Sequence, residues 1–206
     1  TGKWVKPFKK NDFPVINPSN EETFATISLG SKEDTDAAIK AAKNSFNSWK
    51  ETSKAERIKL LEKLLENYKK RFDEMAEAMS LEMGSPIDYA ISTHAASGQS
   101  HIEDFIIRLK EYKFEEHFDD KSNNYIAHEP IGVCGLITPW NWPINQIALK
   151  VIPALATGCT MILKPSEISP ISGMLFAEMI DQAGFPPGIF NLVNGDGNGV
   201  GTQMSS

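Results

Sequence analysis

The stretch IGVCGLITPWNWPINQIALKVIPALATGCTMILKPSE, residues 131–167, decides the fold of this chain. Its first part, residues 131–138, is a short apolar run between turn residues, which predicts a buried strand. Apolar residues then recur at helical spacing over about residues 144–158, and residues 160–164 predict a second strand. Farther on, the pattern predicts a helix over residues 172–183, a strand over residues 189–193 and a helix from Gly199 onward.

Strands that alternate with helices pair in parallel and are joined by right-handed crossovers. We therefore expect an α/β fold with a doubly wound, Rossmann-like parallel sheet, preceded by N-terminal helices. The expected organisation is an N-terminal helical part (residues 1–112), a hairpin (residues 113–129) and a Rossmann-like domain (residues 130–206).

The N-terminal part is expected to begin with short extended segments at residues 4–5, 13–16 and 23–29. Ser31 is a candidate cap for a first helix, and a second helix follows Ser53 and ends at Gly84. A third helix opens at Ser85-Pro86, in the cap-then-proline order. Its apolar side is predicted to contain Ile87, Ile91, Ile102, Phe105, Ile106, Leu109 and Tyr112.

Two histidines, His94 and His101, fall near the apolar side of this third helix. Seven helical residues separate them by about 10 Å of rise, which argues against a shared metal ion. We interpret both as packed or supporting histidines, and we expect no metal site.

A hairpin is predicted where the sequence period changes after the third helix. Residues 113–118 and 125–129 are short β-like runs joined by the polar residues 119–124. A two-stranded ribbon alone is marginally stable in water, so we expect this one to pair with something else.

The composition favours a cytoplasmic protein that binds neither nucleic acid nor membrane. Of 206 residues, 41% are hydrophobic and 23% charged, and the net charge of −6 argues against a nucleic-acid surface. No uninterrupted apolar run approaches the length that spans a bilayer, and no signal-peptide pattern opens the chain. Cys134 and Cys159 lie in apolar sequence and outside any CxxC motif, which indicates reduced thiols.

Asn141 lies in Pro139-Trp140-Asn141-Trp142-Pro143, directly after the first predicted strand. Each proline fixes its own φ and restricts the residue before it, so the backbone at Asn141 has little freedom. A side-chain amide held in this way can direct its N–H group at a position where negative charge develops during a reaction. The alternative is an ordinary proline-bounded loop with two packed tryptophans.

Lys164-Pro165-Ser166-Glu167 stands at the carboxyl end of the second predicted strand, the edge at which open α/β sheets bind ligands. The ammonium group of Lys164 can donate to ribose hydroxyls, and the carboxylate of Glu167 can accept from them. A carboxylate here also repels a 2′-phosphate, so we expect NAD rather than NADP. The alternative is an ordinary polar loop leading to Pro170.

The segment GDGNGVG, residues 195–201, follows the third predicted strand and nearly matches the dinucleotide fingerprint, except that Val200 replaces the last glycine. Such a turn lets backbone N–H groups approach a phosphate beside a helix N-terminus. The alternative is a turn that needs glycine because φ is positive.

Together these motifs resemble those of the NAD(P)-dependent aldehyde dehydrogenase superfamily. The resemblance is carried by HEPIGV (128–133), TPWNWP (138–143), PALATGC (153–159), KPSE (164–167) and AGFPPGIFN (183–191). Residues 1–127 match the family's N-terminal region more loosely. The resemblance implies that the chain, which begins at Thr1 rather than Met, is the coenzyme-binding portion of a longer enzyme.

In that family, the asparagine that corresponds to Asn141 stabilises the oxyanion of the thiohemiacetal formed when a cysteine attacks the aldehyde. Lys164 and Glu167 match the grip on the adenosine ribose, and Gly197 and Gly201 match glycines beside the adenine and pyrophosphate. The resemblance implies coenzyme contacts by Ile137, Thr138, Pro139, Trp140, Lys164, Pro165, Ser166, Glu167, Gly197 and Gly201.

The predicted hairpin resembles the family's oligomerisation arm, which implies a homo-oligomer. Strands that the family has beyond residue 206 are also absent, so we expect an open sheet edge that invites pairing with another copy.

The family's cysteine nucleophile and glutamate base lie beyond residue 206, and Cys134 and Cys159 do not match the nucleophile. We therefore expect this chain not to oxidise aldehydes by itself. Three hypotheses remain open. The chain is the coenzyme-binding part of an enzyme that converts an aldehyde to a carboxylic acid through hydride transfer, a non-catalytic nucleotide-binding module, or a self-associating fragment.

Overall fold

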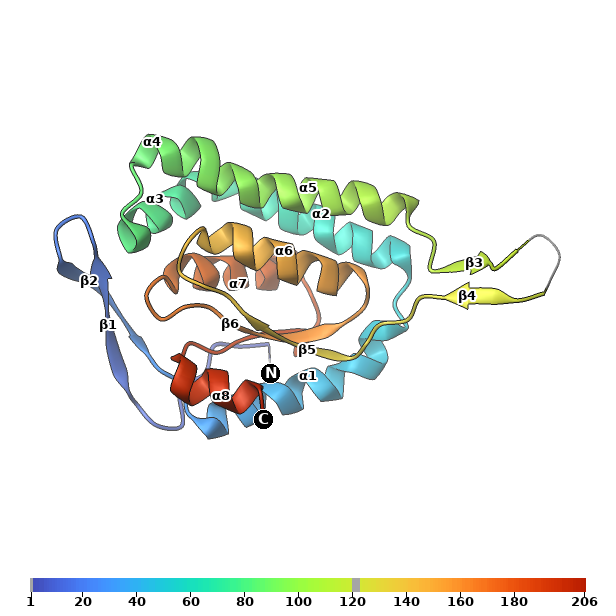
Figure 1. Ribbon diagram of the computed structural model, residues 1–206, viewed down its shortest axis with the longest axis horizontal. Helices are drawn as coiled ribbons and strands as arrows, with labels where there is room; N and C mark the ends of the chain where they lie inside the picture. The colour runs from blue at the N-terminus through green and yellow to red at the C-terminus, as the bar shows by residue number, and fades with distance from the viewer. Residues whose placement is uncertain (1, 120–122) are drawn as a thin grey trace.

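The computed structural model describes residues 2–119 and 123–206 and places a three-stranded parallel sheet at the centre of the molecule (Figure 1). The strands are β5 (Val133–Ile137), β6 (Thr160–Lys164) and β7 (Phe190–Leu192), in that order across the sheet. They are connected by α6 (Pro143–Ala156) and α7 (Ile171–Ala183). The predicted alternation of strands and helices and the parallel pairing are confirmed.

The register brings the carboxyl ends of the three strands to one edge of the sheet. Ile137 pairs with Lys164, and Leu163 pairs with Leu192. All five residues of β6 are buried because it has a neighbour on each side, whereas β5 is half-exposed. The prediction of a buried strand at residues 131–138 is therefore wrong for β5, which has one neighbouring strand among the described residues.

Helices cover both faces of the sheet. Helices α6 and α7 lie on one face, and α1 (Lys32–Lys50) lies on the other together with the short α8 (Thr202–Met204) (Figure 1). Helices α2 (Lys54–Lys70) and α5 (Ala96–Glu111) form a further layer over α6 and α7. The main hydrophobic core therefore includes residues from Trp49 to Ile189 and joins the N-terminal helices to the sheet.

The N-terminal strands β1 (Asp12–Asn17) and β2 (Glu22–Ser28) form an antiparallel hairpin, while the segment at residues 4–5, predicted as extended, forms no strand. Helix α1 begins as predicted. The Ser31 hydroxyl accepts from the Asp34 N–H at 3.3 Å, and the Asp34 carboxylate accepts from the Ser31 N–H at 2.8 Å. This reciprocal capping satisfies two N–H groups that the helix leaves unpaired.

The second predicted helix is two helices, α2 and α3 (Phe72–Met83). Arg71 between them leaves the helical conformation, at φ −113° and ψ 23°. Its guanidinium binds Glu74 at 2.6 Å and Glu178 of α7 at 2.8 Å, so contacts outside α2 accompany the break. Gly84 ends α3 in the left-handed conformation, φ 73°, as its predicted position implied.

The third predicted helix has three parts: α4 (Ile87–Tyr89), the π-helical segment η1 (Ala90–Ala95) and α5. The predicted apolar side holds for α5, where Ile102, Ile106 and Leu109 are buried. It is wrong for Ile87, Ile91 and Tyr112, which are exposed. A π-helical turn has wider spacing than an α-helical turn and rotates the residues before it away from the α5 stripe.

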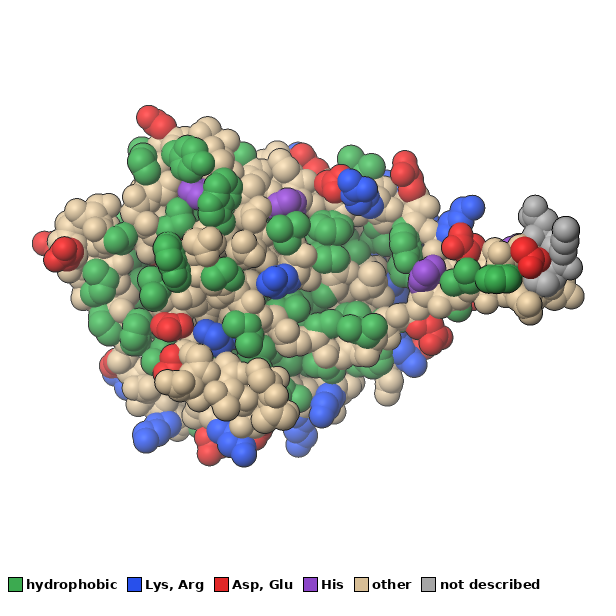
Figure 2. Space-filling model, viewed as in Figure 1, with side chains coloured by type: hydrophobic (Ala, Val, Ile, Leu, Met, Phe, Trp, Pro, Cys, Tyr) green, Lys and Arg blue, Asp and Glu red, His purple; other side chains and the backbone are tan. Residues whose placement is uncertain are grey.

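The predicted hairpin is confirmed as β3 (Glu115–His117) and β4 (Tyr125–Ala127), which pair antiparallel and project from the body of the molecule (Figure 1). Its connection, predicted at residues 119–124, includes residues 120–122, which lie outside the described residues. All six strand residues are exposed. Hydrophobic side chains are visible along this arm and across the middle of the same face of the molecule (Figure 2). Among the described residues, no helix is long and apolar enough to cross a membrane.

Candidate functional site

Hydrogen bonds join the carboxyl ends of all three parallel strands. The Thr138 N–H after β5 donates to the Lys164 carbonyl at 3.1 Å. The Lys164 ammonium group, at the end of β6, donates to the Gly195 carbonyl after β7 at 2.6 Å. The structure therefore brings together the three predicted motifs at one edge of the sheet, where α/β proteins bind ligands.

Lys164 is the central residue of this edge. Its side chain is buried, and its ammonium group also donates to the Pro165 carbonyl at 3.1 Å and to the Glu167 carboxylate at 3.4 Å. Three protein acceptors thus engage its three N–H groups. The Glu167 side chain is 26% exposed, so the carboxylate presents an acceptor at the surface while Lys164 holds it in place.

The residues between Lys164 and Glu167 shape the turn. Pro165 and Ser166 are buried, and the Ser166 hydroxyl accepts from the Ile168 N–H at 3.3 Å. A Cβ atom added to Gly173 of α7 would meet the Pro165 ring at 3.2 Å, so Pro165 packs closely on the first turn of that helix.

The glycine-rich segment forms a π-helical turn, η2 (Gly197–Gly201). Asp196 caps it by accepting from the Gly199 N–H at 2.6 Å. None of its glycines has a positive φ, so the alternative of a turn that needs φ > 0 is wrong. Gly195 is required for space instead, because a Cβ atom there would collide with the fully buried Val200.

Gly201 of this turn lies beside Lys164, and Gly197 faces open space. A Cβ atom on Gly201 would lie 3.9 Å from the Lys164 side chain, which places the η2 turn directly beside β6. A Cβ atom on Gly197 would meet no described atom within 4 Å. The turn therefore leaves room for a ligand at Gly197.

The end of β5 supplies three further predicted residues. Ile137 is 44% exposed and Pro139 is also exposed, whereas Thr138 is buried. The Thr138 hydroxyl has no hydrogen-bond partner among the described residues. It is a buried polar group that a ligand can satisfy.

Asn141 is exposed at the start of α6, between two anchored tryptophans. The Trp140 carbonyl accepts from the buried Ser169 hydroxyl at 3.2 Å, and the Trp142 carbonyl accepts from the Gln146 N–H at 3.0 Å. The first N–H groups of a helix have no intrahelical partner and carry partial positive charge. The Asn141 amide and this helix end together favour a negatively charged oxygen beside them.

Three supporting residues were not predicted as parts of this site. Ser169 anchors Trp140, and no local pattern marks it. His94 was interpreted only as packed or supporting, and it lies 4.5 Å from the Trp142 ring, centroid to centroid. Glu82 fixes the start of α7 from α3, across 89 residues of sequence. Contacts this distant in sequence leave no periodic signal.

Glu82 is a fully buried carboxylate at the N-terminus of α7. It accepts from the Ile171 N–H at 2.6 Å and from the Ser172 N–H at 3.2 Å. Burial raises the pKa of Glu82 from its ordinary 4.5 to about 7, although these N–H groups act in the opposite direction.

The unfolding free energy is expected to depend on pH through Glu82. The folded state binds this proton more tightly than the unfolded state, so the contribution is complete below about pH 4.5 and is lost as the pH rises through about 7. The raised pKa corresponds to up to about 3 kcal/mol across this window. Urea unfolding of wild type and Glu82→Gln at several pH values measures the difference. The exposed Glu77→Gln on the same helix is the control, and identical pH slopes for wild type and Glu82→Gln would contradict the expectation.

The two cysteines lie away from this edge. Cys134 is half-buried within β5, and Cys159 is buried between α6 and β6, before the amino end of that strand. Both are free thiols. Their positions support the expectation that neither serves as the nucleophile beside Asn141. No group of three or more potential metal-binding side chains occurs among residues 2–119 and 123–206.

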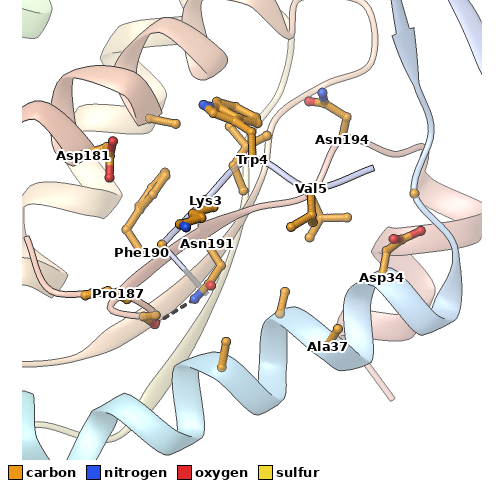
Figure 3. Close-up of a pocket in the computed structure, with 18 of the residues that line it drawn as sticks. Lys3, Trp4, Val5, Asp34, Ala37, Asp181, Pro187, Phe190, Asn191 and Asn194 are labelled. Carbon is orange, nitrogen blue, oxygen red and sulfur yellow. Dashed lines mark hydrogen bonds between the residues drawn. The ribbon is translucent and has the colours of Figure 1, made fainter. Parts of the chain in front are cut away.

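A separate cavity of about 370 Å³ lies beside β7, between the N-terminal segment and α1 (Figure 3). Trp4 and Val5 line it on one side and Ala37 on the other, with Phe190 and Asn191 of β7 between them. Its described lining contains none of the predicted coenzyme residues. We therefore place the candidate site at the carboxyl edge and not in this cavity.

Comparison with known proteins identifies the family. Residues 4–206 match the family model described as the aldehyde dehydrogenase family. The chain is 48% identical, over 206 residues, to a 3-succinoylsemialdehyde-pyridine dehydrogenase from a Pseudomonas species. The aligned residues cover 100% of this chain and 43% of that relative.

Solved structures of aldehyde dehydrogenases have the same fold. The enzyme from Bartonella henselae superposes with a TM-score of 0.97 at 54% identity, over 99% of this chain and 43% of that one. Aldehyde dehydrogenase C from Pseudomonas syringae, a mutant solved with NAD+ and octanal, gives a TM-score of 0.95 at 43% identity, over 99% and 41% of the two chains. This chain therefore spans somewhat less than half the length of these relatives, and it belongs to the aldehyde dehydrogenase family.

Proposed function

We propose that the carboxyl edge of the sheet binds NAD, and that Asn141 is the oxyanion donor in the oxidation of an aldehyde to a carboxylic acid. The observation that carries this proposal is the hydrogen-bonded junction of the three strand ends through Lys164, next to the exposed start of α6. In this proposal, Glu167 is the ribose acceptor, η2 is the glycine turn beside the nucleotide and Asn141 is the amide donor.

The residues at this edge suit a dinucleotide. The Glu167 carboxylate is available to ribose hydroxyls, and the space at Gly197 admits the adenine end of a nucleotide. Ile137, Pro139 and Trp140 supply exposed apolar surface, and the Thr138 hydroxyl supplies a polar group without a partner among the described residues. Pro165, Ser166 and Gly201 hold these groups in position. When bound, NAD supplies the hydride acceptor.

In this proposal, a cysteine thiolate from outside these 206 residues attacks the aldehyde carbon, and the carbonyl oxygen becomes an oxyanion. The Asn141 side-chain N–H donates to that oxygen as its negative charge develops. Such a donor is most effective when it is already oriented, because no reorganisation is then needed during the reaction. The chain alone is expected to give no turnover.

The preference for NAD over NADP rests on Glu167. Its carboxylate lies 3.4 Å from the Lys164 ammonium, so one positive charge is already paired with it. A 2′-phosphate next to the ribose would bring further negative charge to this carboxylate, which disfavours NADP.

Titration calorimetry of this chain with NAD tests the coenzyme site. We expect measurable binding by wild type and at least tenfold weaker binding by Glu167→Ala, a change that corresponds to about 1.4 kcal/mol. The exposed Glu77→Ala on α3 is the control. Equal heats for wild type and Glu167→Ala would remove the ribose role, and turnover of short aldehydes or a pyridyl semialdehyde above blank would refute the expected inactivity.

A second candidate function is self-association, which the exposed hairpin favours. Tyr125 is 60% exposed and Ile126 is 37% exposed on a ribbon that projects from the body. The half-exposed β5 offers an open sheet edge as a second surface. We propose that the protein is a homo-oligomer through these two surfaces. We also propose that the protein is cytoplasmic. Its proposed parts are residues 1–112, 113–129 and 130–206.

Light scattering tests the self-association. We expect the average mass to rise with protein concentration, because the ribbon buries its apolar side chains only against a partner. Tyr125→Lys should lower the mass towards that of a monomer, and Ile107→Lys, an exposed apolar residue on α5, is the control. A monomer at every concentration would contradict this proposal.

A further inference from the structure

Trp142 has a backbone conformation that is rare for a bulky residue. It lies in the left-handed region, at φ 56° and ψ 54°, and precedes α6 without a side-chain capping bond. Among the described non-glycine residues only Glu21, in the turn between β1 and β2, shares a positive φ. Such a conformation persists only where surrounding contacts impose it. The contacts that hold Trp142 therefore also determine the backbone next to Asn141.

The Trp142 side chain belongs to a cluster of three rings. Its centroid lies 4.5 Å from that of His94 and 6.4 Å from that of Tyr89, and the interplanar angles are 70° and 81°. His94 and Tyr89 are themselves 5.1 Å apart, at 87°. All three pairs are edge-to-face, the arrangement that aromatic quadrupoles favour.

The π-helical segment η1 makes this cluster possible. His94 lies within η1, and Tyr89 is the residue directly before it. In an α-helix, residues five apart point about 140° away from each other, because each residue turns the helix by about 100°. The wider π-helical turn, with its i→i+5 bonding, brings them to the same side. The irregular segment thus presents two rings to Trp142 where a regular helix would present one.

His94 is buried in a way that suits a holding role. It is 3% exposed, and its Nδ1 atom has no hydrogen-bond partner among the described residues. Burial lowers the pKa of His94, so the ring is neutral at neutral pH. A buried neutral imidazole with an unpaired nitrogen is costly unless its contacts compensate, and the edge-to-face contacts with Trp142 and Tyr89 contribute to this compensation.

We propose that His94 is a positioning residue whose ring holds Trp142 in the left-handed conformation and thereby fixes the direction of the Asn141 side chain. Asn141 is then fixed from both sides, since Ser169 holds the Trp140 carbonyl before it. The consequence for catalysis rests on the oxyanion role proposed above. The contact by which His94 holds Trp142 does not depend on that role, and it can be measured separately.

Nuclear magnetic resonance of the isotope-labelled chain tests the holding directly. In His94→Ala, we expect the φ-dependent coupling of residue 142 to change and the Asn141 side-chain amide signals to broaden or average. His94→Phe keeps a ring at this place and should restore both signals. His128→Ala is the control, because His128 also contacts an aromatic ring but precedes the other end of β5. Unchanged coupling and amide signals in His94→Ala would overturn the proposal.

A second variant covers the case in which His94→Ala does not fold. His94→Leu fills the space without an aromatic ring, so the same changes at residues 141 and 142 are expected from it. A His94→Leu protein with wild-type signals would show that volume alone suffices, which would overturn the role of the ring.

The catalytic consequence is measured in a protein that joins this sequence to the family's cysteine nucleophile. We expect His94→Ala to lower kcat by about tenfold or more, with the KM for NAD unchanged, because small displacements of a reacting group reduce rates strongly. His94→Phe should restore most of kcat. If Asn141→Ala leaves kcat unchanged while His94→Ala still alters residue 142, the oxyanion role fails and the positioning of Trp142 stands. If His94→Ala changes neither kcat nor the signals of residue 142, while Asn141→Ala lowers kcat, only the positioning role of His94 fails.

Discussion

Replacing Asn141 with alanine is expected to lower kcat for aldehyde oxidation about 10²–10³-fold in a protein that joins this chain to the family's cysteine nucleophile. The amide is exposed at the start of α6, and anchored tryptophans hold it on each side. Its removal takes away a donor that acts only when charge develops on the oxygen. The binding of NAD should therefore remain within about twofold of wild type, since ground-state contacts are unchanged.

Steady-state kinetics and NAD titration together measure this effect. Asn141→Asp keeps the size of the side chain but replaces the N–H donor with a negative charge. Its kcat should therefore fall at least as far as that of Asn141→Ala. Asn44→Ala, an exposed asparagine on α1 at the opposite face of the sheet, is the matched control. A kcat for Asn141→Ala within threefold of wild type would exclude the oxyanion role.

Arg57→Met is expected to lower the free energy of unfolding by about 3–5 kcal/mol, because several neutral acceptors lose their shared donor. Arg57 is 5% exposed, and its guanidinium donates to four acceptors. These are the carbonyls of Lys50 at 2.9 Å, Thr52 at 2.8 Å and Ala156 at 3.3 Å, and the Thr52 hydroxyl at 3.0 Å. Methionine would leave these groups unpaired, at about 1–3 kcal/mol for each that remains buried.

Among residues 2–119 and 123–206, Arg57 forms no ion pair with an acid, and helix ends balance its charge. Lys50 ends α1 and Ala156 ends α6, and the C-terminus of a helix carries partial negative charge. The guanidinium also lies 6.0 Å from the Trp49 ring and 5.6 Å from the Phe114 ring. Gly158, at φ 86°, allows this close approach, because a Cβ atom there would meet the Arg57 side chain at 2.9 Å.

Thermal and urea unfolding check this prediction, and Tm should fall by about 10 °C in a chain of this size. Arg108→Met is the control, since that side chain is 70% exposed and its ion pair with Asp104 contributes at most about 1 kcal/mol. A loss below about 1 kcal/mol for Arg57→Met would show that Arg57 is not needed to join the ends of α1 and α6.

Much of the fold follows from local patterns. The alternation of strands and helices after residue 130, the helix cap at Ser31, the helix start after Ser53 and the helix end at Gly84 were all predicted. Each depends on residues within a few positions of one another, where hydrophobic period and capping chemistry act directly. The break at Arg71 and the π-helical turn at Ala90–Ala95 were missed, because an interrupted helix keeps nearly the same apolar spacing.

The candidate site shows the same division. The motifs around Asn141, Lys164 and Gly197 could be found in the sequence, because rigid turns and strand ends have recognisable residue types. Their meeting at one sheet edge could also be predicted, because the carboxyl ends of parallel strands lie together. The hydrogen bond that joins them could not, since it depends on the Lys164 ammonium reaching the Gly195 carbonyl across 31 residues of sequence. The reason for the glycine turn was also missed, because the need for space beside Val200 arises from packing and not from φ.

The sequence by itself determined the order of strands and helices, the family and the candidate residues for nucleotide binding, because these depend on short-range patterns. Only the tertiary structure decided how the groups are held. It joins Lys164 to the Gly195 carbonyl, Glu82 to the first N–H groups of α7, and His94 to Trp142 beside Asn141. These contacts join residues between 31 and 89 positions apart, where burial and ring geometry act and local periodicity carries no information.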